Sequence, residues 1–315
     1  MTNITIGGIT ILPGTSKRID LPVARLPTQT MLSLPIHVIN GLSDGPHLWL
    51  SAAIHGDELN GIEIIRQVLT QVTPRKLRGA LLAVPIVNMF GFIEQSRYLP
   101  DRRDLNRSFP GSTRGSLAAR LAHLFMTEVV NHCSHGIDLH TASHHRLNFP
   151  QIRANLEDPE TYRCAQAFGA PVVLHATSRD GSLRQAAARK GISVLLYESG
   201  EALRFDKHGI GIGVEGVLKV MTALDMLNRP SYQTLDTSPL EFKETKWVRA
   251  SRSGILHLQT ELGEGIHKRQ KLGYITDAFG EKTNTIKAPC AGRVIGYTQN
   301  PLVNQGDGIV HLAVT

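Results

Sequence analysis

A histidine and a glutamate three residues apart, His55 and Glu58, are the first side chains in this 315-residue chain whose spacing suggests chemistry. They lie within residues 52–61, between an apolar run at 48–50 and a segment with apolar residues at helical spacing, which predicts a strand, a sharp turn and a helix. Imidazole nitrogen and carboxylate oxygen suit zinc, whose catalytic sites use three protein ligands and leave one position for water. In the alternative interpretation, His55 packs at a strand end and Glu58 caps the helix N-terminus, where the helix dipole favours an anion.

Two later segments with the pattern of strands end in residues that could complete such a site. In segment 136–141, alternation places Asp138 and His140 on one face, so Asp138 can orient a metal-binding His140. Glu198 ends the apolar run 192–197. Sites in open α/β folds lie outside the carboxyl ends of the strands, so we expect these side chains to converge there with His55.

Four short segments together resemble the succinylglutamate desuccinylase/aspartoacylase family, which belongs with the zinc carboxypeptidases. In chain order they are His-Gly-Asp-Glu at 55–58, Asp-Leu-Asn-Arg at 104–107, Asp-Leu-His-Thr at 138–141 and Tyr-Glu-Ser-Gly at 197–200. The resemblance is close over residues 45–230 and looser beyond them. It implies one zinc ion per chain held by His55, Glu58 and His140, and Glu198 as the general base for the attacking water.

The order of the predicted elements favours a three-layer α/β domain with a mixed, largely parallel sheet, as in zinc carboxypeptidases. The predicted strands are 47–54, 80–87, 136–141, 171–175 and 192–198, and the predicted helices are 60–72, 115–131, 182–190 and 209–227. Residues 1 to about 45 are expected to form edge strands that lead into the first of these strands.

A polar stretch at 229–246 without helical spacing indicates a boundary near residue 240. We therefore predict a hydrolase domain over 1–240 and a small all-β domain over 241–315. The second domain resembles the barrel-sandwich fold of biotinyl and lipoyl carriers, but it has no Met-Lys-Met motif for modification. We expect a structural role for it, either as one wall of the cleft or in contacts between subunits of a homo-oligomer.

A polar loop at 88–112 contains candidates for substrate recognition, because loops of this length inside a compact domain are usually functional or disordered. Its four arginines within residues 97–107 would, on composition alone, indicate a solvated loop. The family resemblance implies instead that Asn106 and Arg107 face the substrate. A guanidinium group can bind a carboxylate through two parallel hydrogen bonds, and an amide adds a neutral donor.

The resemblance also implies a further arginine upstream of that pair, at an offset that varies among relatives. Arg97 is the candidate for a second partner of the carboxylate or for an oxyanion partner, but Arg102 or Arg103 could fill this place. Residues 144–153 follow the predicted ligand strand and are expected to form a substrate-facing loop with Arg153 in the pocket.

Charge and aromatic content indicate what kind of molecule the protein binds. The formal net charge of +7 and the pI of about 9.4 could attract nucleic acid or an anionic small molecule. The basic residues are dispersed and aromatic residues make up only 5%, which favours the small molecule over nucleic acid. Three widely spaced cysteines without a Cys-x-x-Cys pair, no signal-peptide pattern and no long apolar run predict a cytoplasmic protein that does not enter membranes.

The combined expectation is a zinc-dependent amidohydrolase that removes the acyl group from a small N-acylated amino acid or a related carboxylate-bearing compound. No Gly-x-Ser-x-Gly motif suggests a serine nucleophile. One alternative is a zinc carboxypeptidase with the same metal centre and an open groove for peptides. Another is a non-catalytic ligand-binding relative, although ligand binding alone would not require Glu198.

Overall fold

The computed structural model describes residues 2–177, 180–228, 238–281 and 283–315. Strands up to residue 228 are β1 Ile4–Ile6, β2 Ile9–Ile11, β3 Thr15–Arg25, β4 Met31–Asn40, β5 Ser43–Ala52, β6 Arg78–Val84, β7 His135–His140, β8 Arg146–Ala154, β9 Val172–His175 and β10 Ser193–Gly200. Helices are α1 Asn60–Gln71, α2 Met89–Ile93, α3 Leu117–Glu128, α4 Pro159–Phe168, α5 Leu183–Ala188 and α6 Lys207–Ala223, with 3-10 turns at Leu105–Arg107 and Val130–His132.

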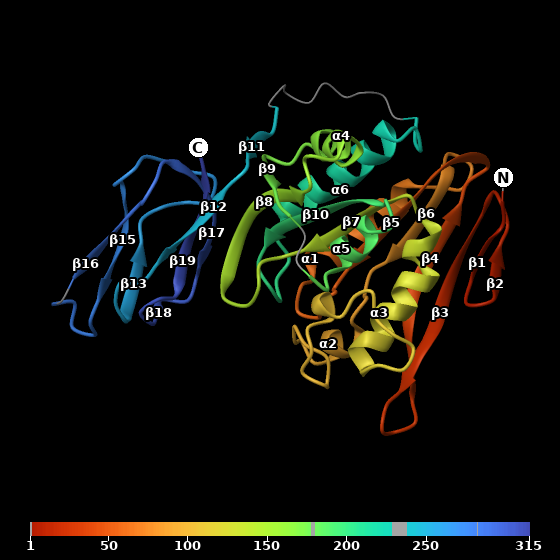
Figure 1. The fold of residues 1–315 in the computed structure, drawn as a ribbon, viewed down its shortest axis with the longest axis horizontal. Helices are drawn as coiled ribbons and strands as arrows, with labels where there is room; N and C mark the ends of the chain where they lie inside the picture. Colours follow the sequence, from red (N-terminus) through yellow and green to blue (C-terminus); the bar gives the residue numbers. More distant parts are fainter. Residues whose placement is uncertain (1, 178–179, 229–237, 282) are drawn as a thin grey trace.

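A mixed sheet runs through the molecule in the order β3-β4-β6-β5-β7-β10-β8, which confirms the predicted fold class (Figure 1). Its centre, β6-β5-β7-β10, is parallel. Strand β4 is antiparallel to both β3 and β6, and β8 is antiparallel to β10. Central parallel strands are covered on both faces and therefore favour continuous apolar runs. Leu48, Trp49 and Leu50 in β5 form such a run and are fully buried.

Helices cover both faces of this sheet. One apolar core joins α1, α4 and α6 to one face, and the other joins α2, α3, α5 and the β1–β2 hairpin to the opposite face. Glycines allow α6 to pack closely, since a Cβ on Gly213 would lie 2.4 Å from Ile64 and one on Gly216 would lie 2.3 Å from the Phe168 ring. The predicted three-layer arrangement follows from these two cores.

Three parts of the chain differ from the sequence prediction. Residues 144–153 were expected to form a loop, but Arg146–Ala154 is β8, whose Pro150 and polar residues obscure the strand pattern. Helix α4 was not predicted, although Asp158 caps it and Gly169 ends it in the left-handed region, which are ordinary helix signals. The predicted loop 88–112 contains α2 and a 3-10 turn.

The N-terminal prediction of edge strands is correct for β3, which pairs only with β4 in the described chain. Strand β4 lies inside the sheet between β3 and β6, and β1 pairs with β2 in a separate small sheet. Among the described residues, no helix has the length and apolar character needed to cross a membrane.

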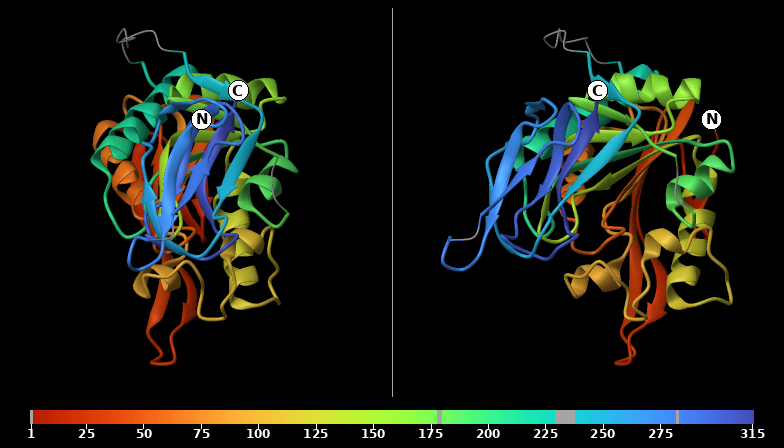
Figure 2. Two further views of the ribbon diagram at one scale, coloured as in Figure 1. Left: turned by 90° about the vertical axis from the view of Figure 1, so that its left-hand side faces the viewer. Right: turned by 60° about the vertical axis from the view of Figure 1, so that its left-hand side comes forward.

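The C-terminal region is built from short strands that pair antiparallel, except β11, which is parallel to β9. They are β11 Leu240–Phe242, β12 Thr245–Arg249, β13 Gly254–Leu258, β14 Gly265–Ile266, β15 Lys271–Thr276, β16 Asn284–Lys287, β17 Gly292–Thr298, β18 Leu302–Val303 and β19 Gly308–Val314. One sheet, β16-β15-β13-β18, shares an apolar core with the strands β12, β19 and β17. Figures 1 and 2 show these blue strands at the end of the molecule opposite the red N-terminal strands.

The main sheet continues into the C-terminal region without interruption. Strand β17 pairs with β8, and β11 pairs with β9, so backbone hydrogen bonds join the parts on either side of residue 240. The division into domains 1–240 and 241–315 stays a prediction, and the boundary signal at 229–231 lies outside the described residues. What the pairing establishes is that β8 has partners from both parts of the chain.

Candidate metal centre and active site

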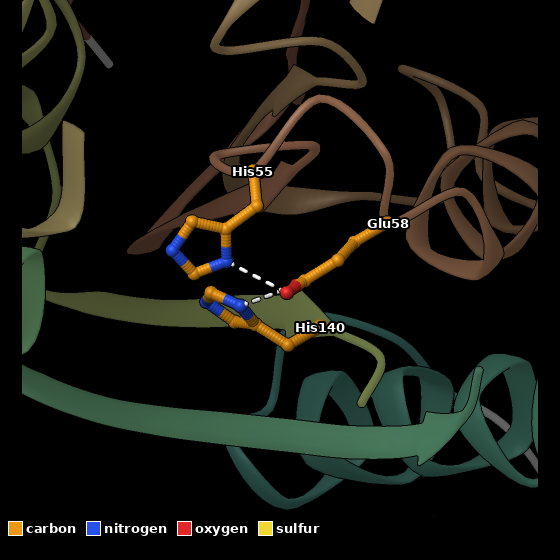
Figure 3. A group of neighbouring side chains, drawn as sticks. All are labelled: His55, Glu58 and His140. Atoms are coloured by element: carbon orange, nitrogen blue, oxygen red, sulfur yellow. Dashed lines mark hydrogen bonds and ion pairs between the residues drawn. The ribbon is translucent and has the colours of Figure 1, made fainter. Parts of the chain in front are cut away.

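Two histidines and a glutamate meet at the carboxyl end of the parallel strands (Figure 3). Nδ1 of His55 lies 2.7 Å from Oε1 of Glu58, and Nδ1 of His140 lies 2.7 Å from Oε2 of the same carboxylate. One ligand atom from each residue lies within 4.8 Å of the others, and all three side chains are buried. The three residues predicted as metal ligands are therefore close enough to hold one metal ion.

A tight turn after β5 directs His55 and Glu58 to this point. The amides of Val87 and Asn88 donate to the carbonyls of Ala52 and Ala53, which fixes the start of the turn. A Cβ on Gly56 would lie 1.9 Å from the backbone of Gly91, so only glycine allows the turn to lie against α2. The turn that carries His55 and Glu58 therefore follows directly from the end of β5 and requires glycine at position 56.

The Asp138 carboxylate supports His140, as alternation along the strand predicts. Oδ2 of Asp138 lies 2.8 Å from Nε2 of His140, and Oδ1 accepts a hydrogen bond from Ser51 at 2.8 Å. Metal-binding histidines commonly use their second nitrogen in such a contact, which sets the tautomer and the ring orientation. Nδ1 of His140 is therefore the nitrogen left for a metal ion.

Asp104 has a similar place beside His55, although we assigned it no role from the sequence. Its Oδ1 lies 3.3 Å from Nε2 of His55, and its Oδ2 accepts from Arg97 Nη2 at 2.9 Å. Nη1 of Arg97 is 3.5 Å from Oε1 of Glu58. Asp104 therefore links His55 of the proposed metal site to Arg97, which lines the cavity.

Arg97 is the only one of the three candidate upstream arginines that lines the cavity. The Arg103 side chain is 62% exposed and lies 3.6 Å from Asp101. Arg102 is exposed at a position with positive φ. The structure therefore favours Arg97 over the two alternatives as the arginine that reaches a substrate.

The electrostatics of the cluster suit a divalent cation. Burial would raise the pKa of Glu58, but His55 and His140 hold it well below its usual range. Burial would lower the pKa of both histidines, but Asp138 and Glu58 raise that of His140 well above its usual value, and Glu58 and Asp104 raise that of His55. The carboxylates thus favour positive charge at the ring nitrogens, and imidazole and carboxylate are both suitable metal ligands.

A cavity of about 980 Å³ opens onto the cluster. Its lining includes the four other predicted site residues, which are Asn106, Arg107, Arg153 and Glu198. The C-terminal region also contributes, through Lys243, Glu244, Thr245, Trp247 and His311. All eight predicted site residues therefore belong to one site.

Glu198 lies directly across from His140 in the pairing of β10 with β7. Oε2 of Glu198 accepts a hydrogen bond from the Asn148 amide, and Oε1 lies 3.7 Å from Nε of Arg153. Asn148 and Arg153 are both in β8. Strand β8 thus holds the carboxylate from the side opposite β7.

Asn106 and Arg107 lie in the 3-10 turn that follows Asp104. The side-chain oxygen of Asn106 accepts from the backbone N–H of Leu183 at 2.9 Å, which ties the turn to the start of α5. The Arg107 guanidinium donates to the carbonyl of Asn106. Asn106 therefore has a structural contact in addition to its place in the cavity, while Arg107 is held by one backbone oxygen.

The C-terminal wall of the cavity is a stack of three side chains. The Arg146 guanidinium lies 4.7 Å from the centre of the Trp247 ring, and Trp247 stacks on His311 at 4.4 Å with an angle of 5°. Burial, together with Arg153 and Arg146, lowers the pKa of His311 to about 3, so its ring is neutral at ordinary pH. The sequence suggested the C-terminal region as one possible wall of the cleft but gave no signal for these residues, because the Trp247–His311 contact depends on the pairing of β12 with β19.

The fold agrees with the comparison to known proteins. The succinylglutamate desuccinylase/aspartoacylase catalytic domain matches residues 44–224, more than half of the chain. The chain belongs to this family of deacylating hydrolases.

Individual relatives are similar over nearly the whole chain. N-alpha-acetyl-L-2,4-diaminobutyric acid deacetylase from Halomonas elongata is 27% identical over 312 residues, covering 89% of this chain and 85% of the relative. The crystal structure of succinylglutamate desuccinylase/aspartoacylase from Rhodobacter sphaeroides is 25% identical, with a TM-score of 0.83 over 94% and 95% of the two chains. The product-bound ectoine utilization protein EutE (DoeB) from Ruegeria pomeroyi has the same fold, with a TM-score of 0.85, 22% identity and 95% of each chain covered.

Proposed function

We propose that this protein is a zinc-dependent amidohydrolase that removes an acyl group from a small N-acylated amino acid or a related carboxylate-bearing compound. The observation that carries the proposal is the buried cluster of His55, Glu58 and His140 at the end of a cavity-lining sheet. Two imidazole nitrogens and one carboxylate make the kind of three-residue set that catalytic zinc sites use. We propose one zinc ion per chain.

In this proposal, a zinc ion at these three residues would polarise the amide carbonyl and lower the pKa of the attacking water. Glu198 accepts the proton of that water and returns it to the leaving nitrogen, in the manner of a general base that then acts as a general acid. The Glu198 carboxylate accepts a hydrogen bond from Asn148 and lies 3.7 Å from Nε of Arg153. The geometric basis for this role is the position of Glu198 beside His140 in the sheet.

Arginines supply the remaining functions of the proposed site. Arg97, 3.5 Å from Glu58 and on the cavity lining, is placed to stabilise the negative oxygen that develops during attack on the carbonyl. Arg107 and Asn106 bind the substrate carboxylate, and Arg153 is a further contact on the opposite side. This distribution supports an anionic small molecule as the substrate.

The main alternative is a zinc carboxypeptidase that acts on peptides. Trp247, His311 and residues 243–245 line the cavity from the C-terminal region, so these residues form part of its wall and limit its extent. That wall favours a compact substrate. The Halomonas relative, whose name specifies a deacetylase for an acetylated diamino acid, supports the same choice.

A substrate panel combined with metal analysis tests the proposal. Zinc-loaded protein should hydrolyse at least one member of a set of N-acetyl and N-succinyl amino acids, including N-α-acetyl-L-2,4-diaminobutyrate, and should act poorly on short peptides. His140→Ala should lose most bound zinc and activity, because it removes one of three protein ligands. His208→Ala, on the exposed start of α6, is the matched control.

Three results would contradict the proposal. Faster cleavage of peptides than of acyl amino acids would favour the carboxypeptidase. Equal zinc content in His140→Ala and the parent protein would remove the cluster as the zinc site. Absence of hydrolysis across the whole panel, with one zinc bound per chain, would favour a ligand-binding relative.

A further inference from the structure

Asn148 lies where three strands of the sheet meet. Within β8 it pairs with Gly200 of β10 on one side and with Gly296 of β17 on the other. The pairing of β10 is irregular between Glu198 and Gly200, and the pairing of β17 with β19 is irregular between Val294 and Gly296. Such irregularities often redirect a side chain next to an active site.

The Asn148 side chain is buried, with only 8% of the residue exposed, and its Nδ2 donates to Oε2 of Glu198. Arg153, the other β8 residue near this carboxylate, lies 3.7 Å from Oε1, beyond hydrogen-bond distance. Asn148 therefore makes the closer of the two contacts. A glutamate side chain has several rotatable bonds, so one short contact strongly limits where its carboxylate points.

Gly296 leaves space for the other end of the Asn148 amide. A Cβ added to Gly296 would lie 2.6 Å from Oδ1 of Asn148 and 3.1 Å from the carbonyl oxygen of Leu147. Real Cβ atoms do not approach an oxygen so closely, so any side chain here would displace the amide or the β8 backbone. Because Gly296 has no side chain, the Asn148 amide has room for its observed position.

We propose that Asn148 is a positioning residue that aligns Glu198 for proton transfer, and that β17 sets this alignment through Gly296. The inference rests on the proposed role of Glu198 as the general base. It assigns the C-terminal strands a part in catalysis that is separate from lining the cavity. A single chain of contacts, Gly296 to Asn148 to Glu198, connects the two parts of the molecule.

Kinetics of four variants at equal zinc content test this proposal. They are Asn148→Ala, Asn148→Asp, Gly296→Ala and, as the matched control, Gly265→Ala in β14, where an added Cβ meets nothing within 4 Å. The probe is the N-acyl amino acid that the parent protein hydrolyses fastest. Asn148→Ala should lower kcat by roughly 10- to 150-fold, the range for a lost hydrogen bond to a charged group, with KM changed less than threefold.

Gly296→Ala should lower kcat in the same way by several fold, and Gly265→Ala should leave both constants unchanged. Asn148→Asp keeps the shape of the side chain but replaces the donor by an acceptor, so it should lose kcat as Asn148→Ala does. This second variant also decides the question if Asn148→Ala fails to fold. A rise in KM with constant kcat, or full activity of Asn148→Asp, would overturn the proposal.

A double-mutant comparison separates positioning from general damage. If Asn148 acts through Glu198, then Asn148→Ala should have little further effect on kcat in a Glu198→Gln background. An equal loss in both backgrounds would mean that Asn148 acts elsewhere. If Glu198→Gln alone retained kcat, Glu198 would not be the general base. That result would refute the proposed function itself and differs from the result that would refute the role of Asn148.

Discussion

Asp138 lies 2.8 Å from Nε2 of His140, while Nδ1 of the same ring lies 2.7 Å from Glu58. Each nitrogen of the ring therefore faces one carboxylate. Ser51 holds the second oxygen of Asp138, so the support of His140 extends into β5. These contacts restrict rotation of the ring. Nδ1 therefore already has the orientation needed for the proposed metal ion.

Asp138→Asn should weaken zinc binding by about 10- to 100-fold, the usual effect of replacing a residue that supports a metal-binding histidine. The amide has nearly the same shape, but it faces Nε2 with either a neutral oxygen or an N–H donor, so the negative charge that supports the ring is lost. Competition with a chromophoric chelator would measure the affinity. Ser51→Ala, which removes only the bond behind Asp138, should cause a smaller loss; equal affinities for Asp138→Asn and the parent would show that His140 does not need this support.

Zinc binding should release protons, and the apparent affinity should rise with pH. Burial opposes protonation of His55 and His140, but Glu58 and the other carboxylates raise the pKa of both rings above 6.5. In chelator-treated protein the raised pKa values favour protonated rings, and a metal ion must displace those protons. Calorimetric titrations at pH 7 in buffers of different ionisation enthalpy would count the protons. No dependence on the buffer would contradict the raised pKa values.

Glu198→Gln should retain zinc and nearly all stability but lose most turnover. The amide has almost the same shape and cannot accept the proton of water, and general acid–base catalysis contributes about 10²- to 10⁴-fold. The comparison requires kcat at matched zinc occupancy. A decrease of less than threefold would assign the base to another residue.

Arg107→Lys should lower kcat/KM for the carboxylate-bearing substrate by roughly 10- to 150-fold. Lysine keeps the charge but cannot form two parallel bonds, and one charge-assisted hydrogen bond is worth about 1.5–3 kcal/mol. The Arg107 guanidinium lines the cavity and donates to the Asn106 carbonyl, and it forms no ion pair with the residues that the structure describes, so it can reorient toward a substrate without breaking one.

The control for this variant is the amide analogue of the same substrate, which lacks the carboxylate. The analogue should be a poor substrate for the parent and should lose much less activity with Arg107→Lys. Equal proportional losses for the acid and the amide would show that Arg107 has a structural role.

Two glycines of α6 should respond oppositely to alanine. Gly211→Ala, at an exposed site with nothing within 4 Å of the new Cβ, should stabilise the protein by about 0.5–1 kcal/mol through helix propensity. Gly216→Ala places a methyl group 2.3 Å from the buried Phe168 ring, and overpacking of about 1–3 kcal/mol should exceed that gain. Urea denaturation would compare the two free energies of unfolding. Stabilisation by both changes would mean that α4 and α6 separate readily.

The sequence was most informative where chemistry follows directly from local structure. His55 and Glu58 lie on one turn, and Asp138 and His140 alternate along one strand, so their convergence follows from local geometry and the edge rule for α/β sheets. Asn148 could not be found in this way. Its role depends on two partner strands, one of them about 150 residues further along the chain, and Pro150 obscured the strand itself.

The C-terminal wall was predicted only as a region. Nothing local to Trp247 indicates that it would lie beside His311 and Arg146, because these contacts arise from strand register across three parts of the chain. Asp104 is different, since it stands in a recognised motif. Its contact with His55 could have been proposed from the need of a metal-binding histidine for a second partner.

The pairing of β17 with β8 covers part of an edge of the main sheet. Without the C-terminal strands, the backbone N–H and C=O groups of residues 146–148 would face solvent as an open edge. Such an edge is a template for pairing with another chain and for aggregation. A shortened protein that ends near residue 240 would therefore be expected to self-associate, even though it keeps His55, Glu58 and His140. The C-terminal strands thus cover an edge that would otherwise be open to strands from neighbouring molecules.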